Sequence, residues 1–107
     1  MENIIKPVFW TTRATKDLKK VTRFYGQLYG TEKAKEIALK IRKSTDILEN
    51  PDFDFSKIGT VDSSFSHLKR TYRKLFNGYC KITYREGNKY IYIVRVFEER
   101  QNPTKNR

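Results

Sequence analysis

The amino-acid sequence predicts a single α+β domain, in which two helices pack on one face of a twisted, mostly antiparallel sheet of about four strands. Apolar residues recur at helical spacing through the first half of the chain. Apolar, aromatic and β-branched runs separated by turn-forming residues fill positions 68–103. At 107 residues the chain is long enough for one core and too short for two, so residues 1–107 are expected to form one unit.

The first strand is predicted at positions 4–11, which are rich in β-branched and aromatic residues. Pro7 has no N–H to donate to a ladder, so this strand is expected at an edge of the sheet.

A helix is predicted from about Arg13 to Tyr29, where apolar residues follow each other at steps of four and three: Ala14, Leu18, Val21, Tyr25 and Leu28. Charged residues lie off this apolar face, namely Lys16, Asp17, Lys19, Lys20 and Arg23. Thr12 or Thr15 is expected to cap the start of the helix, and Gly30 to follow its end.

A second helix is expected to start with Thr31 as its cap and to stop at Asn50-Pro51, so that the two helices form a hairpin around Gly30. Residues 52–66 show neither the apolar spacing of a helix nor the alternation of a strand. They are expected to form either a loop that contacts a ligand or an irregular crossover anchored by its phenylalanines.

Three antiparallel strands are predicted in positions 68–103, joined by turns at Asn77-Gly78 and at residues 86–89. On the middle strand, side-chain alternation separates an apolar face with Cys80, Ile82 and Tyr84 from a basic face with Tyr79, Lys81, Thr83 and Arg85. The last strand, residues 90–97, is nearly all apolar and is expected to be central, with a partner for Arg95. The expected core contains Leu18, Val21, Ile37, Ile41, Ile82, Tyr84 and Ile93.

The charge balance indicates a polyanionic or acidic partner, because Lys and Arg outnumber Asp and Glu by 23 to 12, a net charge of +11. A single cysteine, Cys80, and a single histidine, His67, form neither a disulfide nor a Cys/His zinc site, so no metal or cofactor is expected. The chain shows neither a secretory signal nor an apolar run of about 18 residues, and a cytoplasmic protein without membrane contacts is expected.

Candidate functional residues are the cations of the predicted sheet, since no phosphate-binding loop or zinc-protease motif occurs. Part of this set is expected to converge on one surface that binds phosphates: Lys69, Arg70, Arg73, Lys74, Lys81, Arg85, Arg95 and Arg100. The accompanying tyrosines either stack on bases or fill the core: Tyr72, Tyr79, Tyr84 and Tyr92. Glu98 and Glu99 are expected to be solvated charges.

The order of strand, helical hairpin, crossover and meander resembles the RelE/ParE superfamily of bacterial toxins, which includes plasmid stabilisation proteins. The family's helical hairpin is similar to Ala14-x-x-Asp17-Leu18, Ala34, Ile41 and Leu48-x-x-Pro51. Its meander and ending are similar to Asn77-Gly78-Tyr79-x-Lys81-Ile82-x-Tyr84-Arg85, Ile91-x-Ile93-x-Arg95-Val96-Phe97 and Arg100-Gln101-Asn102-Pro103.

The resemblance implies the toxin of a type II toxin-antitoxin operon, neutralised by a small cognate antitoxin. The resemblance is compatible with two targets. ParE-like members poison DNA gyrase, whereas RelE-like members cut messenger RNA in the translating ribosome. RNA cleavage would assign catalytic roles to Lys81, Arg95, Glu98 and Arg100.

Target or nucleic-acid binding would use the sheet cations Lys69, Arg70, Arg73, Lys81, Arg85 and Arg95. Glu98 stands where ribonuclease members commonly carry a basic residue, and together with the ending this favours the ParE side. An acidic residue can still act as a general base, so the RelE-like activity stays open. A non-toxic nucleic-acid-binding module and an inactive member that only binds an antitoxin are further alternatives.

Overall fold

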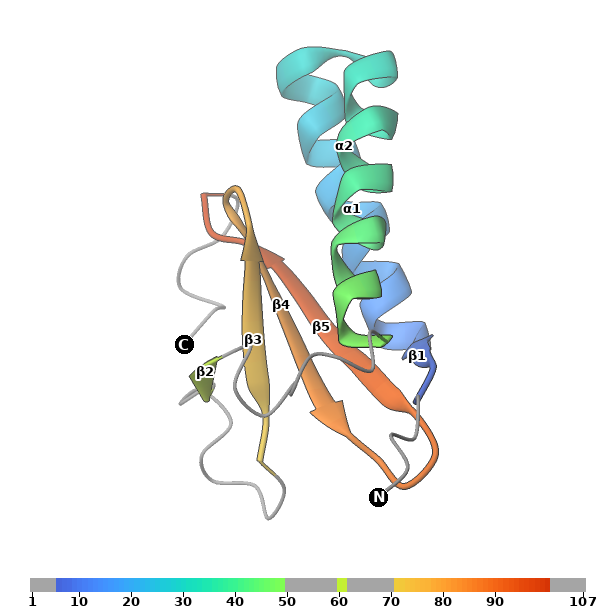
Figure 1. Ribbon diagram of the computed structural model, residues 1–107. Helices are drawn as coiled ribbons and strands as arrows, with labels where there is room; N and C mark the ends of the chain where they lie inside the picture. Colours follow the sequence, from blue (N-terminus) through green and yellow to red (C-terminus); the bar gives the residue numbers. More distant parts are fainter. Residues whose placement is uncertain (1–5, 50–59, 62–70, 101–107) are drawn as a thin grey trace.

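The computed structural model describes residues 6–49, 60–61 and 71–100. Along the chain it contains these elements: β1 (Val8–Trp10), α1 (Thr12–Tyr29), α2 (Thr31–Ser44), the 3-10 helix η1 (Thr45–Glu49), β2 (Thr60–Val61), β3 (Arg73–Asn77), β4 (Cys80–Glu86) and β5 (Ile91–Glu98). The predicted α+β order of one strand, a helical hairpin and a three-stranded meander is confirmed (Figure 1).

The strands form one sheet in the order β1-β5-β4-β3-β2, with β1 parallel to β5 and the other pairs antiparallel. As predicted, β1 lies at an edge and β5 lies inside the sheet. Pro7 contributes its carbonyl, which accepts a hydrogen bond from the backbone N–H of Ile91 at 3.0 Å. The sheet has a fifth strand that the sequence did not predict, because β2 pairs with β3 through residues 60 and 61.

The helix caps differ from the prediction. Thr11 caps α1 in place of Thr12 or Thr15, since its Oγ1 accepts the backbone N–H of Ala14 at 3.2 Å. The Thr11 hydroxyl also donates to the carbonyl of Ile93 on β5 at 2.8 Å, which joins the start of the helix to the sheet.

The turn between the helices is made by Gly30, as predicted, at a φ of +90° that favours glycine. Gly30 also occupies the N-cap position of α2, so Thr31 is the first helical residue and makes no side-chain cap. The α-helix ends at Ser44 and continues as η1 to Glu49. The predicted stop at Asn50-Pro51 lies outside the described residues.

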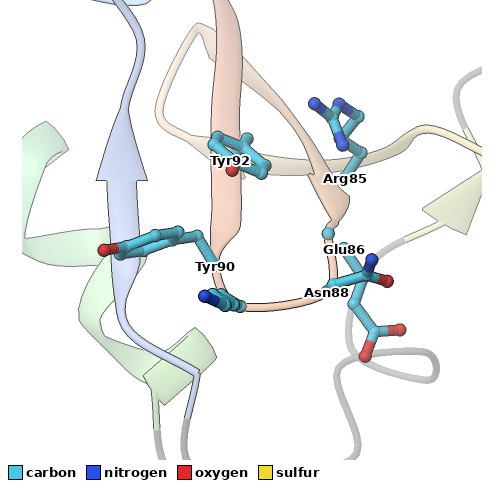
Figure 2. Close-up of a pocket in the computed structure, with 7 residues that line it drawn as sticks. Arg85, Glu86, Asn88, Tyr90 and Tyr92 are labelled. Carbon is cyan, nitrogen blue, oxygen red and sulfur yellow. The ribbon is translucent and has the colours of Figure 1, made fainter.

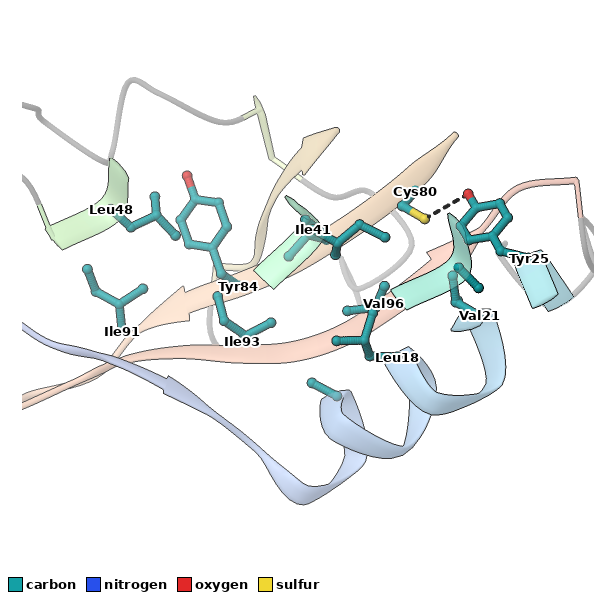
Figure 3. Close-up of a cluster of buried hydrophobic side chains, with 13 residues drawn as sticks. Leu18, Val21, Tyr25, Ile41, Leu48, Cys80, Tyr84, Ile91, Ile93 and Val96 are labelled. Carbon is teal, nitrogen blue, oxygen red and sulfur yellow. Dashed lines mark hydrogen bonds between the residues drawn. The ribbon is translucent and has the colours of Figure 1, made fainter. Parts of the chain in front are cut away.

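The core lies between the helical hairpin and one face of the sheet (Figure 3). Of the predicted core residues, all are buried except Ile37, which is half-buried and packs against the cluster. α1 packs against β5, and Leu18 and Val21 of α1 lie beside Val96 of β5 (Figure 3). Ile41 of α2 belongs to the same buried cluster as Ile82 and Tyr84 of β4. The helices therefore cover one face only, and the tip of their hairpin extends beyond the sheet (Figure 1).

Among the described helices, none has the length and apolar character needed to cross a membrane.

Candidate functional site

The sheet face turned away from the helices, here called the outer face, carries alternating cations and aromatic rings. Register and side-chain alternation place nine side chains on it: Phe9, Lys74, Phe76, Lys81, Thr83, Arg85, Tyr92, Arg95 and Phe97. Across the strands, Lys81 lies opposite Phe97, and Arg85 lies opposite Tyr92. The predicted basic face of β4 is thus part of a mixed cationic and aromatic surface.

The cations of the outer face stack on its rings. The Arg85 guanidinium carbon lies 4.4 Å from the centroid of Tyr92. Phe97 is shared by two cations, with the Arg95 guanidinium carbon at 4.5 Å and the Lys81 Nζ at 5.5 Å from its centroid. These cation–π contacts hold the long side chains along the sheet.

Of the predicted sheet cations, the outer face brings together Lys74, Lys81, Arg85 and Arg95. Lys81 is 3% exposed and its neighbour Thr83 is 0% exposed, so the middle of the outer face is closed to solvent. Arg73 pairs with Tyr84, whose side chain is in the core, so Arg73 lies on the helix side of the sheet. Arg85 and Arg95 are half-buried on the outer face. Lys69 and Arg70 lie outside the described residues.

Some of the predicted tyrosines lie in the core and others lie at the surface. Tyr84 is buried in the core, whereas Tyr92 belongs to the outer face and Tyr79 is exposed beside Arg100.

A depression of about 650 Å³ opens at the end of the outer face where β4 turns into β5, and is called the turn pocket here (Figure 2). It is lined by Arg85, Glu86, Asn88, Lys89, Tyr90 and Tyr92, together with the glycine of the turn. Figure 2 shows Arg85 and Tyr92 above the turn and Tyr90 extending toward β1. Arg85 Nη1 is buried and has no hydrogen-bond partner in the described structure.

Phe9 completes an aromatic cluster beside the turn pocket. Its ring centroid lies 5.8 Å from those of Tyr90 and Tyr92, and these two lie 5.9 Å from each other. Phe9 is 49% exposed and Tyr90 is 39% exposed. Neither Phe9 nor Tyr90 belongs to the binding residues predicted from the sequence. The pattern that could have indicated Phe9 is side-chain alternation on the edge strand, where Phe9 points outward between the more buried Val8 and Trp10.

Glu98 lies on the opposite side of the sheet. In the register of β4 and β5, Glu98 lies opposite Cys80. Its side chain is 0% exposed, so the prediction of a solvated charge is wrong. Arg100 reaches back to it, with Nη2 at 2.9 Å and Nε at 3.1 Å from Oε2, and the Arg100 backbone N–H binds Oε1. Burial alone raises the pKa of the Glu98 carboxyl, but the hydrogen bonds from Arg100 outweigh it and hold this pKa below its ordinary value.

The neighbours of Glu98 are unreactive. Tyr25 Oη lies 3.3 Å from Cys80 Sγ (Figure 3), and burial raises the pKa of both the Tyr25 hydroxyl and the Cys80 thiol. A thiol that is protonated and fully buried is a poor nucleophile.

Arg95 has the partner that the sequence requires. Its Nε donates to Asp17 Oδ2 of α1 at 2.8 Å, and the same oxygen accepts the backbone N–H of Val96 at 3.0 Å.

The four residues of the ribonuclease hypothesis therefore do not converge. Lys81 and Arg95 lie on the outer face, while Glu98 and its partner Arg100 lie at the helix side of the sheet. Each of the four makes internal contacts with an ion-pair partner or an aromatic ring.

The family model of the ParE toxin of type II toxin-antitoxin systems, parDE, matches residues 8–103. The chain belongs to the ParE toxin family. A solved structure described as the chromosomal ParDE toxin-antitoxin system from P. aeruginosa is similar, with a TM-score of 0.71 and 23% sequence identity, over 88% of this chain and 96% of that chain. No curated protein sequence matches. The RelE/ParE resemblance is confirmed, and the chain is a type II toxin.

Proposed function

We propose that this ParE-family toxin inhibits DNA gyrase and does not cleave messenger RNA. The observation that carries the proposal is the position of Glu98, which is buried, paired with Arg100 and separated by the sheet from Lys81 and Arg95.

Cleavage of RNA needs a group that takes the 2′-hydroxyl proton next to cations that stabilise the scissile phosphate. Glu98 is unsuited to the first role because its pKa is lowered and both of its oxygens already accept hydrogen bonds from Arg100. Lys81 is unsuited to the second because it is 3% exposed. This geometry suits a toxin that binds and blocks its target better than one that cleaves RNA.

The outer face beside the turn pocket supports a protein target. Tyr and Arg are enriched among the residues that dominate protein–protein binding energy, and this surface combines the partly exposed rings of Phe9 and Tyr90 with the half-buried guanidinium of Arg85. We propose that gyrase contacts this surface.

The first experiment measures supercoiling by purified gyrase at increasing toxin concentration. Arg85→Ala and Tyr90→Ala are each expected to raise the inhibitory concentration about tenfold, a loss of about 1.4 kcal/mol of binding free energy. Leu39→Ala, an equally simple truncation of an exposed residue on α2, is the control and is expected to change nothing. Full supercoiling at toxin concentrations that arrest growth would refute the proposal.

The second experiment follows cells after induction of the toxin. Supercoiling is expected to fail, and a DNA-damage response to begin, before translation stops. Rapid cutting of messenger RNA in translating ribosomes, lost in Arg95→Ala, would establish the RelE-like activity instead.

A type II toxin has a cognate antitoxin. We propose that the antitoxin presents a net acidic, amphipathic segment that orders on binding, because the toxin carries a charge of +11 together with exposed rings. Co-expression with the adjacent gene should give a complex that survives moderate salt. Free expression of the toxin at high level, with no copurifying protein, would contradict this.

A further inference from the structure

The charged side chains exposed on the first three turns of α1 are all positive. Every charged side chain that α1 exposes between Thr12 and Arg23 is basic, and these five are called the α1 basic stripe: Arg13, Lys16, Lys19, Lys20 and Arg23. They line a depression of about 350 Å³ on the surface of the helix. At 1.5 Å of rise per residue the stripe is about 15 Å long.

Within the described residues, Asp17 is the carboxylate that lines the same depression, and it offsets only part of the charge of the stripe. Asp17 has a side chain that is 9% exposed, and its Oδ2 is bound to Arg95 Nε and to the backbone N–H of Val96. Its other oxygen lies 3.7 Å from Arg13 Nε, so this carboxylate, already bound to Arg95, also forms an ion pair with Arg13.

The second helix shows what an ordinary solvated face looks like in this protein. On α2, Glu36 lies between Lys33 and Lys40, with N–O distances of 3.8 and 3.6 Å, so charges of opposite sign alternate at helical spacing. On α1, by contrast, Lys16 has like-charged neighbours three and four residues on, at Lys19 and Lys20. Such pairs destabilise a helix, so the stripe is maintained at a cost to folding and points to an anionic partner.

The composition of the stripe selects the kind of partner. An acidic protein segment that folds on binding needs apolar side chains to bury, and no apolar side chain is exposed between Thr12 and Arg23. The exposed apolar residues of α1 come later, at Leu28 and Tyr29. A sugar-phosphate backbone needs only cations. Each strand of a duplex carries one phosphate per about 3.4 Å of duplex axis, so a stripe aligned with that axis spans about four phosphates of one strand.

We propose that the α1 basic stripe binds the phosphate backbone of duplex DNA without reading its sequence. The choice of DNA rests on the proposed gyrase target, which works on DNA. Contact through the stripe would hold the toxin on the same duplex as the enzyme and raise its local concentration there.

The test measures binding of the purified toxin to a fluorescent duplex of about 20 base pairs by anisotropy, over a series of salt concentrations. The triple variant Lys16→Gln, Lys20→Gln and Arg23→Gln removes part of the stripe. The triple variant Lys33→Gln, Lys35→Gln and Lys43→Gln removes the same charge from exposed positions of α2. Circular dichroism checks that both variants keep the fold.

The stripe variant is expected to reduce the slope of log affinity against log salt by roughly 2 to 3, and to weaken binding at least about tenfold. The α2 variant is expected to stay within about twofold of the unchanged protein because its cations lie off the DNA contact. Equal losses in the two variants would overturn the proposal, since only net charge would then matter.

Two further outcomes would also overturn it. One is tighter binding to single-stranded RNA than to duplex DNA. The other is a stripe variant that binds DNA normally and loses the complex with the antitoxin, which would assign the stripe to a protein partner. The assay contains no gyrase, so failure of gyrase inhibition in the supercoiling experiment is a separate result from failure of DNA binding here.

Discussion

The carboxylate of Asp17 binds Arg95 across 78 residues of sequence, with Oδ2 at 2.8 Å from Arg95 Nε and at 3.0 Å from the backbone N of Val96. β1 pairs with residues 91–93 of β5 and goes no further, so the edge of β5 is open at Val96. Asp17 closes this edge from α1 and fixes the helix against the sheet.

Asp17→Ala should therefore destabilise the protein by about 1–3 kcal/mol, because it leaves a buried backbone N–H and a half-buried guanidinium without an acceptor. Urea denaturation measures the change as a lower midpoint at a constant slope. Asp46→Ala removes an exposed carboxylate and serves as the control. Equal stability of the two variants would show that the Asp17 contact contributes little.

Truncation in the core should be far more costly than truncation on the outer face. Ile82 is 0% exposed beneath the helices, so Ile82→Ala is expected to cost about 2–5 kcal/mol through lost burial and a cavity. Phe76→Ala removes a larger side chain on the neighbouring strand that is mostly in solvent, and it should cost less than about 1 kcal/mol. Thermal or urea unfolding of both variants tests the assigned faces of the sheet.

Stability should fall in acid because of Glu98. Its folded-state pKa is lowered from the ordinary value of 4.5, chiefly by Arg100, so the unfolded chain binds a proton first as the pH drops. The stabilisation is complete above about pH 4.5 and is lost as the pH falls through the folded-state pKa.

Glu98→Gln should accordingly be less stable than the unchanged protein at neutral pH, and the difference should shrink below about pH 4.5. Urea midpoints at several pH values measure it. Glu32→Gln, an exposed carboxylate of α2, controls for the loss of one charge. A gap between Glu98→Gln and the unchanged protein that persists undiminished in acid would contradict the assigned pairing.

Two glycine-to-alanine changes should have opposite effects. At Gly87 an added Cβ would lie 2.5 Å from Tyr92 Cε2 and 3.1 Å from the carbonyl oxygen of Tyr90, so Gly87→Ala is expected to displace the Tyr92 ring from Arg85 and to destabilise the turn pocket. At Gly26, inside α1, the nearest atom would be Ala34 Cβ at 4.0 Å. Gly26→Ala should raise stability by about 0.5–1 kcal/mol. Melting temperatures measure the stability of both variants, and the supercoiling assay with gyrase measures the effect of Gly87→Ala on the turn pocket.

Much of the fold was predictable because its signals are local. The steps of four and three in α1, the alternation of Cys80, Ile82 and Tyr84, the missing N–H of Pro7 and the positive φ at Gly30 each depend on a few neighbouring residues. The hydrophobic effect then forces the apolar face of the helices onto the apolar face of the sheet.

The site was less predictable because burial and register are long-range properties. The sequence required a partner for Arg95, but only the packing of α1 on β5 identified it as Asp17. The pairing of β3 with β4 turned Arg73 to the helix side, and a charged residue at the end of β5 became buried because Arg100 folds back onto Glu98. The sequence by itself determined the helical hairpin, the edge strand β1 and the three-stranded meander. The tertiary structure decided the pairing of β2 and which charges lie inside, because burying a charge depends on partners that distant segments supply.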